Sequence, residues 1–340
     1  MKVIFLSREK VTYSRSGFLY QNYLGQKEFH QLRGKRRNLS SQLTSIAENN
    51  KDQIAAIVVM SPNHNLVRII RKSFKEIIIL DAGWPLSDSN FTRKININSY
   101  FLAFKNLLVD LIAFHLADRI LFESEAQLVR SSKKFKFDIK KGKVIYTNCS
   151  KTFNNFFVQN QKRQIDQDNY VFFRGKYNRE SGLDNILNAA RILEKQYKFV
   201  IATNQEICNL PQNVTLISEY LEEENILKYY QNASLVLGQL SKHKRIDYTI
   251  PHKFFEAAAL GKAYLTVDAK SMRELADDSM VQYIDNVSAE NIAKQINILI
   301  SDKQKSIKLG SNLRKMFEKK LNSNLHSATF HNYLSEFKQL

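Results

Sequence analysis

Residues 250–266 read IPHKFFEAAALGKAYLT, a short apolar helix followed by a strand-like run. Pro251 suits the first turn of a helix, and Gly261 ends the helix after a row of alanines that lets it lie close to a sheet. Lys253 and Glu256 stand three residues apart in the first turns. These two residues indicate either a solvated helix start or a site that holds an anion beside a hydroxyl-rich ligand.

The same alternation of strand and helix runs through the chain. Predicted strands comprise residues 2–7, 53–60, 76–83, 118–124, 143–148, 170–175, 198–203, 214–220, 234–240 and 263–268. Predicted helices comprise residues 38–49, 64–74, 97–117, 182–196, 222–231 and 251–260, a helix that starts at Glu125, and further helices over 288–340. Because strands that alternate with helices favour parallel sheets, we predict an α/β fold of two doubly wound, Rossmann-like domains facing across a cleft.

A polar segment rich in Asn and Gln separates the two halves. Residues 151–169, KTFNNFFVQNQKRQIDQDN, show no periodicity and are predicted to be a linker. The N-terminal domain is then 1–150 and the C-terminal domain 170–325. The final residues, 326–340, form a predicted helix that is a candidate for packing back on the N-terminal domain.

Composition indicates a folded, soluble protein. The hydrophobic content is 44% with 22 Phe and 15 Tyr, which argues against disorder. The two cysteines match no disulfide or metal-binding spacing, so we expect a reducing cytoplasm. The N-terminal apolar run is too short for a secretory signal. The apolar helix 97–117 carries three ionisable side chains, and we expect it to be part of the fold rather than a membrane span.

The formal charge of +18 is concentrated in the N-terminal half. Residues 1–150 hold 25 Lys and Arg against 12 Asp and Glu. The excess gathers in LRGKRR (32–37) and RSSKKFKFDIKKGK (130–143). Such a field attracts nucleic acid, anionic lipid head groups or phosphorylated substrates, unless the chain is simply lysine-rich.

A second candidate for anion binding follows the strand 170–175. Gly175 ends the strand, Lys176 comes next and Arg179 lies in the same loop. A glycine lets a ligand approach the backbone, and the two cations can neutralise phosphate oxygens. An ordinary loop with solvated charges is an equally good interpretation of this stretch alone.

Taken together, the two stretches indicate a nucleotide. His252 and Lys253 lie where a helix start favours a phosphate, and Glu256 suits the hydroxyls of a ribose. The order and spacing of the motifs resemble the C-terminal domain of retaining nucleotide-sugar glycosyltransferases of the two-domain GT-B fold, in the large family 4 group (glycosyl transferases group 1). The resemblance implies that Lys253 and Glu256 contact the diphosphate and ribose of the donor, and it matches Gly175 and Lys176 to the phosphate loop.

The sequence departs from that family at several positions. Many relatives carry a further glutamate eight residues before the position of Glu256, where this chain has Tyr248. Relatives usually have Arg after the loop glycine and Lys before the helix glycine, where this chain has Lys176 and Ser181. Arg179 is a candidate substitute, and Asp81 stands where relatives have a histidine.

The resemblance implies transfer of a sugar, with retention, from a nucleotide diphosphate to a hydroxyl of a glycan or lipid-linked acceptor. Lys176, Arg179 and Lys253 would stabilise the departing diphosphate, so we expect no essential metal and no cofactor besides the donor. Asp81 is the further catalytic candidate. Candidate acceptor-binding residues are Arg15, His64 and Trp84, each with an equally plausible structural role.

In this fold the N-terminal half binds the acceptor. We hypothesise that its basic runs meet the anionic inner face of a membrane, which makes the protein cytoplasmic with peripheral membrane contact. Two alternatives stay open. The fold could be an inactive scaffold or regulatory subunit, given Tyr248 and Ser181. A nucleic-acid-binding protein is disfavoured, since the chain carries no recognised motif of that class.

Overall fold

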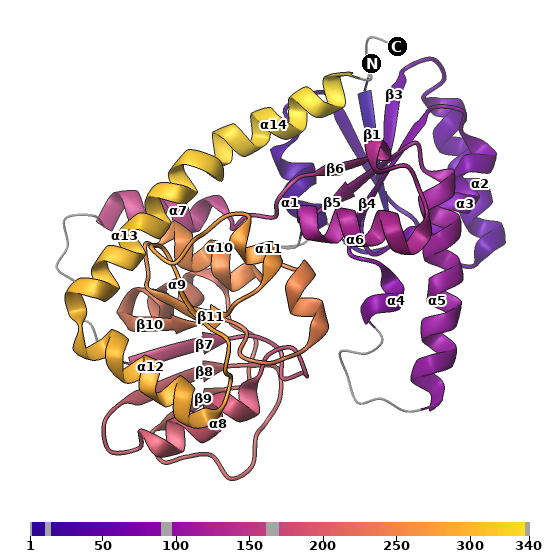
Figure 1. Cartoon of the computed structure of the whole chain (residues 1–340). Coiled ribbons are helices and arrows are strands. Elements are labelled where there is room, and N and C mark those ends of the chain that lie inside the picture. Colours follow the sequence, from indigo (N-terminus) through magenta and orange to yellow (C-terminus); the bar gives the residue numbers. More distant parts are fainter. Residues whose placement is uncertain (1, 11–14, 90–96, 161–169, 337–340) are drawn as a thin grey trace. The chain divides into compact units, whose positions relative to one another are not determined.

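The computed structural model describes residues 2–10, 15–89, 97–160 and 170–336 (Figure 1). Its internal contacts divide the chain into two compact units. Unit 1 comprises Met1–Thr147 together with Ser323–Leu340, and unit 2 comprises Asn148–Asn322. Each unit is built on its own parallel sheet, which is the α/β fold predicted from the sequence.

Unit 1 contains a six-stranded parallel sheet in the order β2-β1-β3-β4-β5-β6. Its strands are β1 (Lys2–Ser7), β2 (Lys27–Gln31), β3 (Ile54–Val59), β4 (Ile77–Gly83), β5 (Arg119–Phe122) and β6 (Gly142–Val144). Its helices are α1 (Arg15–Asn22), α2 (Arg36–Asn49), α3 (His64–Ser73), α4 (Leu86–Ser89), α5 (Ile97–Leu116), α6 (Glu125–Phe135), the short η1 (Ile139–Lys141) and α14 (Ser323–Ser335). The strand order reverses between β1 and β3, which is where doubly wound sheets bind ligands.

The sheet of unit 1 is buried on both faces, as a parallel sheet requires. Alternate residues of β1 enter different apolar clusters: Ile4 and Leu6 face one, Val3 and Phe5 the other. The second cluster includes Phe330 of α14. The C-terminal helix thus supplies part of the core of unit 1, and Ser327 of α14 donates a hydrogen bond to Asn22 of α1.

Unit 2 contains a second six-stranded parallel sheet, in the order β12-β11-β10-β7-β8-β9. Its strands are β7 (Tyr170–Arg174), β8 (Lys198–Ala202), β9 (Val214–Ile217), β10 (Ala233–Leu237), β11 (Tyr264–Val267) and β12 (Gln282–Ile284). Its helices are α7 (Lys151–Asn160), α8 (Leu183–Ile192), α9 (Glu223–Asn232), η2 (Lys244–Tyr248), α10 (His252–Ala259), α11 (Lys270–Arg273), α12 (Ala289–Ser301) and α13 (Lys303–Lys320). Here the order reverses between β7 and β10.

The structure adds elements that the sequence did not indicate. Helix α1 and strands β2 and β12 were not predicted. The segment expected to be an irregular linker begins with helix α7, whose Phe153 is buried against Tyr230. The remainder of that segment, 161–169, lies outside the described residues.

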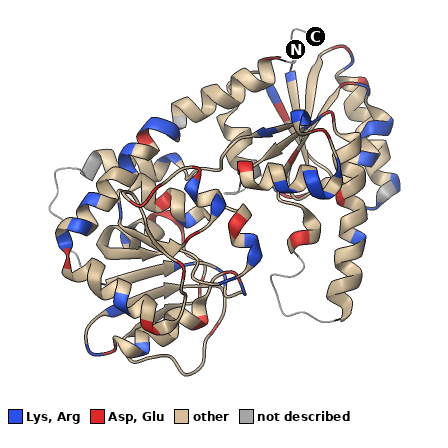
Figure 2. Ribbon diagram, in the orientation of Figure 1, with Lys and Arg blue, Asp and Glu red and all other residues tan. Residues whose placement is uncertain are grey.

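Helix α5 is unusually apolar and exposed. It is the only helix among the described residues long and apolar enough to cross a membrane by length and composition, with a mean hydropathy of 1.3, and only 22% of the residues in its most apolar window are buried. Figure 2 shows it almost without charge, in contrast to α2, α3 and α6. Its exposed large apolar residues are Ile97, Tyr100, Phe101, Leu102, Phe104, Leu108, Leu111, Ile112 and Leu116. By length and composition α5 thus meets the criteria for a membrane span, whereas its three ionisable side chains led us to expect that it would not.

Candidate functional site

The predicted donor residues of unit 2 gather where its strand order reverses. Strand β7 ends at Arg174, and Gly175 follows it at the carboxyl edge of the sheet. Helix α10 brings Lys253 to the same place, because a methyl group on Gly175 would lie 3.0 Å from Lys253 Nζ. The glycine thus leaves room for the lysine beside the strand end. The two stretches singled out in the sequence, around Gly175 and around Lys253, meet at one site.

Lys253 is buried, with 7% of its surface exposed. Its Nζ lies 3.9 Å from the centre of the Phe173 ring, a cation–π contact. Burial, together with the nearby charge of Arg174, lowers the pKa of Lys253 to about 7. A lysine held in this way gains most when an anion arrives, because the anion restores the stability of its charged form.

Glu256 lies one turn further along α10 and is fully buried. Arg174 Nη1 donates to its Oε1 at 2.5 Å, and Tyr230 Oη donates to its Oε2 at 2.6 Å. Burial, followed by the negative charge of Glu256, raises the pKa of Tyr230 well above its usual value, so the phenol keeps its proton and donates. Both oxygens of the carboxylate are therefore already used within unit 2.

The loop after Gly175 carries two exposed cations. Lys176 and Arg179 are exposed, and neither forms an ion pair with a described residue. The N–H of Gly175 donates to the carbonyl of Ala202 at 2.9 Å, so it continues the sheet. Positive charge for a ligand at this loop comes from the side chains rather than from that N–H.

Ser181 lies in the loop after β7, and His252 lies at the start of α10. The Ser181 hydroxyl is buried in the turn, where it donates to the carbonyl of Asn178 and accepts from the N–H of Leu183. Gly182 follows at φ +67°, and a methyl group there would lie 2.0 Å from the carbonyl oxygen of Leu240. Ser181 thus shapes the loop, while His252 is the half-buried first residue of α10.

Four residues at this site were not predicted from the sequence. Arg174 and Tyr230 bind Glu256, and the buried Glu180 accepts a hydrogen bond from Arg245 at 2.5 Å. Arg174 could have been found from the sequence, because it directly precedes the loop glycine, Gly175. Tyr230 and Arg245 lie on separate elements whose packing no local pattern reveals.

In unit 1, Arg15 and Asp81 form a buried ion pair. Arg15 Nε lies 2.8 Å from Asp81 Oδ1, and the two side chains are 4% and 1% exposed. The guanidinium also donates to the carbonyls of Ile145 and Phe122 and to the Thr147 hydroxyl. Both candidates therefore join the carboxyl ends of β4, β5 and β6 and have little surface to offer a ligand.

His64, the next acceptor candidate, is also buried. Its Nδ1 lies 2.7 Å from Asp110 Oδ1, and the carboxylate of Asp110 accepts the backbone N–H groups of Leu86 and Ser87. The pair joins α3 to α5 and fixes the start of α4. Trp84, the third candidate, is half-buried directly after β4.

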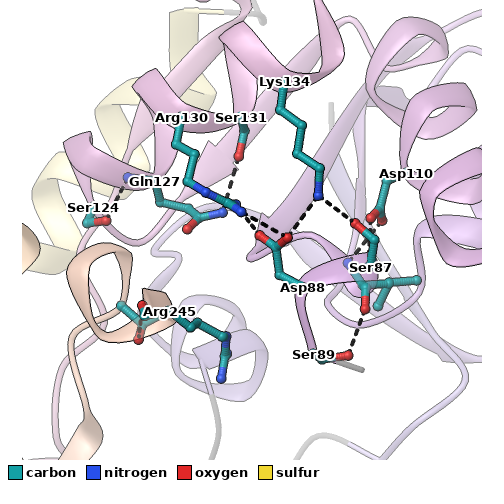
Figure 3. Close-up of polar contacts among 12 residues, drawn as sticks. Ser87, Asp88, Ser89, Asp110, Ser124, Gln127, Arg130, Ser131, Lys134 and Arg245 are labelled. Atoms are coloured by element: carbon teal, nitrogen blue, oxygen red, sulfur yellow. Dashed lines mark hydrogen bonds and ion pairs between the residues drawn. The ribbon is translucent and has the colours of Figure 1, made fainter. Parts of the chain in front are cut away.

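The basic run 130–143 is partly neutralised within unit 1. Asp88 of α4 accepts hydrogen bonds from Arg130 and Lys134 of α6, as Figure 3 shows. Burial alone would raise the pKa of Asp88, but the bonds from Arg130 and Lys134 outweigh it and hold the pKa below its usual range. The exposed cations of the run whose side chains form no ion pair or hydrogen bond with a described residue are Lys133, Lys136, Lys140 and Lys143.

Among the described residues, no group of three or more His, Cys, Asp or Glu side chains could hold a metal ion. Separately, the side chains of Lys253, Lys176 and Arg179 give this edge of unit 2 positive charge that suits an anionic ligand.

Two parallel six-stranded sheets, each doubly wound and covered by helices, define the GT-B fold. The chain is similar in structure to Anabaena Alr3699/HepE, solved in complex with UDP-glucose, with a TM-score of 0.71, 14% identity and coverage of 100% of this chain and 99% of that one. It is also similar to sucrose-phosphate synthase from Thermosynechococcus elongatus, with a TM-score of 0.76, 11% identity and 99% coverage of both chains. A third similar structure is a glycosyltransferase from Rickettsia africae, with a TM-score of 0.69, 11% identity and coverage of 99% of this chain and 98% of that one.

Sequence comparison adds a family match within unit 2. Residues 155–316 match the family of glycosyl transferases group 1. That stretch contains Gly175, Lys253 and Glu256. No curated protein is significantly similar to the chain in sequence.

Proposed function

We propose that this protein is a glycosyltransferase that moves a sugar from a nucleotide diphosphate to a hydroxyl of a glycan or lipid-linked acceptor. The GT-B fold and the glycosyl transferases group 1 match over 155–316 support this class. The observation that carries the proposal is Lys253, a buried cation beside Gly175 where the strand order of unit 2 reverses. UDP is the first nucleotide to test, because Anabaena Alr3699/HepE was solved with UDP and with UDP-glucose.

In this proposal, the diphosphate binds among Lys253, Lys176 and Arg179. Their charges stabilise the leaving group as the bond to the sugar breaks and positive charge develops at the sugar carbon. These cations do the work that a divalent metal does in other transferases, so the proposed reaction needs neither metal nor cofactor. Retention at the transferred sugar is part of the proposal.

Glu256 is proposed to face the ribose. Its side chain is 1% exposed and bound to Arg174 and Tyr230, so a ribose hydroxyl reaches it only by taking the place of one partner. Arg174 is the partner that can be displaced, because 29% of its side chain is exposed. Its guanidinium is then free to join the cations around the diphosphate.

We also propose that unit 1 contacts an anionic membrane surface, where lipid-linked acceptors are found. The exposed apolar side chains of α5 support this contact, together with exposed cations of the runs 32–37 and 130–143. Apolar residues enter the head-group region while nearby cations meet anionic lipid, and the two contributions reinforce each other. The location that corresponds to this proposal is the cytoplasm, with peripheral contact to the membrane.

The test is calorimetric titration of UDP, GDP and ADP into the wild type and into Lys253→Met and Glu256→Gln. The control is Lys198→Met, an exposed lysine at the start of β8. Binding of one nucleotide that both site variants lose, and the control keeps, supports the donor site.

Absence of binding in the folded wild type contradicts the enzyme and favours the alternative of an inactive GT-B scaffold or regulatory subunit. Binding of nucleic acid without binding of any nucleotide would instead favour the less expected nucleic-acid function. Circular dichroism of each variant shows whether it is folded.

A further inference from the structure

Unit 1 contains an open pocket of about 500 Å³ that none of the predicted catalytic, donor-binding or acceptor-binding residues enters. Its lining residues are Arg8, Gly34, Lys35, Leu39, Asn65, Arg68 and Ile69. Three of the seven are cations and none is acidic. Leu39 and Ile69 form its apolar part.

The pocket lies where a doubly wound sheet binds ligands. Arg8 directly follows β1, Gly34 and Lys35 follow β2, and Arg68 lies in α3 after β3. These three strands are neighbours in the sheet, and the strand order reverses between β1 and β3. The lining residues therefore come together at the carboxyl edge, at the reversal point.

The charges of the pocket are uncompensated by the described part of the chain. Arg8 Nη2 donates to the carbonyl of Gly34 at 3.2 Å, which orients the guanidinium. No carboxylate among the described residues forms an ion pair with Arg8, Lys35 or Arg68. By contrast, Arg130, Arg174 and Arg245 each have a carboxylate partner. Three like charges around one pocket repel each other, and an anion removes that cost.

The arrangement suits a phosphate better than a neutral sugar. Arginine presents a planar fork of donors that matches phosphate oxygens, and lysine adds a point charge. Hydroxyl groups of a sugar, by contrast, are usually bound by carboxylates and amides, of which this pocket offers only Asn65. The pocket also lies beside the first turns of α2 and α3, whose dipoles favour an anion.

We infer that this pocket binds a phosphate group carried by the acceptor, so that the acceptor is a phosphorylated sugar or a lipid phosphate. That the bound phosphate belongs to an acceptor rests on the proposed transferase function. The anion site itself is argued from residues of unit 1 alone. Arg68 and Arg8 contact the phosphate oxygens and Lys35 balances the remaining charge.

The test is titration of glycerol 3-phosphate into the full chain with UDP present in excess to occupy the donor site. Arg68→Gln is compared with Lys72→Gln, which removes the same charge from an exposed position one turn further along α3 and outside the pocket. We expect Arg68→Gln to weaken phosphate binding about tenfold, a loss of one charge-assisted contact, and Lys72→Gln to change it less than about twofold. Equal losses in the two variants, or no phosphate binding in the wild type, would overturn the inference.

UDP titrations of the same variants separate the two proposals. If UDP binds normally but phosphate binding does not depend on Arg68, the pocket proposal is rejected and the donor-site proposal is retained. If UDP does not bind but phosphate binding depends on Arg68, the donor-site proposal is rejected and the pocket proposal is retained. Sedimentation with phosphatidic acid vesicles, against phosphatidylcholine alone, then identifies the source. Arg68-dependent binding to the acidic vesicles indicates a lipid phosphate, and its absence a soluble sugar phosphate.

Discussion

Arg15 Nε lies 2.8 Å from Asp81 Oδ1, in a pair that is almost completely buried in unit 1. Further donors of the same guanidinium bind the carbonyls of Phe122 and Ile145. One arginine thus joins the ends of three strands. Arg15 is the first residue of α1 and lies 66 residues before Asp81, so the contact is a long-range one.

Replacing Arg15 should therefore destabilise unit 1 strongly. Arg15→Met leaves the Asp81 carboxylate buried without its cation, which costs about 3–5 kcal/mol of unfolding free energy. Urea denaturation followed by circular dichroism measures the loss, with the exposed Arg33→Met as control. A loss below about 1 kcal/mol would show that solvent reaches Asp81 and would restore the pair as candidates for ligand contact.

The Tyr230–Glu256 contact gives a second prediction. Tyr230→Phe keeps the ring against Phe172 but removes the donor to a buried carboxylate, which costs about 1–3 kcal/mol. The matched control is Tyr229→Phe, since the Tyr229 ring also contacts Phe172 and its hydroxyl forms no hydrogen bond with a described residue. Thermal unfolding of both variants checks the difference. Equal melting temperatures of the two variants would mean that the hydrogen bond from Tyr230 to Glu256 does not stabilise the fold.

The ion pairs of Asp88 predict a pH-dependent stability. The lowered pKa of Asp88 means that its ion pairs with Arg130 and Lys134 stabilise the fold above the unfolded-state pKa of about 3.9. That stability is lost as the pH falls through the folded-state pKa. Asp88→Asn should thus cost about 1 kcal/mol at neutral pH and almost nothing in acid.

Urea denaturation over the pH range measures this difference, with the exposed Glu48→Gln as control. A deficit of Asp88→Asn that stays constant into strong acid would contradict the ion-pair explanation.

Most of the fold could be predicted because buried parallel strands are nearly continuous apolar runs. Segments such as 53–60 and 234–240 show this clearly. Strand β2, with the sequence KEFHQ, escaped prediction because every residue in it is only half-buried at the sheet edge. Helix α7 escaped because its apolar residues are embedded in a polar, Asn-rich segment.

The candidate site could be predicted in position but not in its contacts. Lys253 and Gly175 were found because each follows local rules for helix starts and strand ends. The hydrogen bonds of Glu256 come from residues 82 and 26 positions away, so they depend on how β7, α9 and α10 pack. The burial of Arg15, Asp81 and His64 is likewise a tertiary property that residue type alone does not reveal.

Lys253 gives the prediction that bears most directly on function. Because burial and Arg174 lower its pKa to about 7, the free protein loses this charge as the pH rises above neutrality. A diphosphate binds the charged form, so the affinity for UDP should fall by up to about tenfold per pH unit between about pH 7 and pH 9. Titration calorimetry measures the slope, and Lys253→Met should bind more weakly with a flatter profile. Parallel profiles for the two proteins would show that another group carries the pH dependence and that Lys253 does not meet the diphosphate.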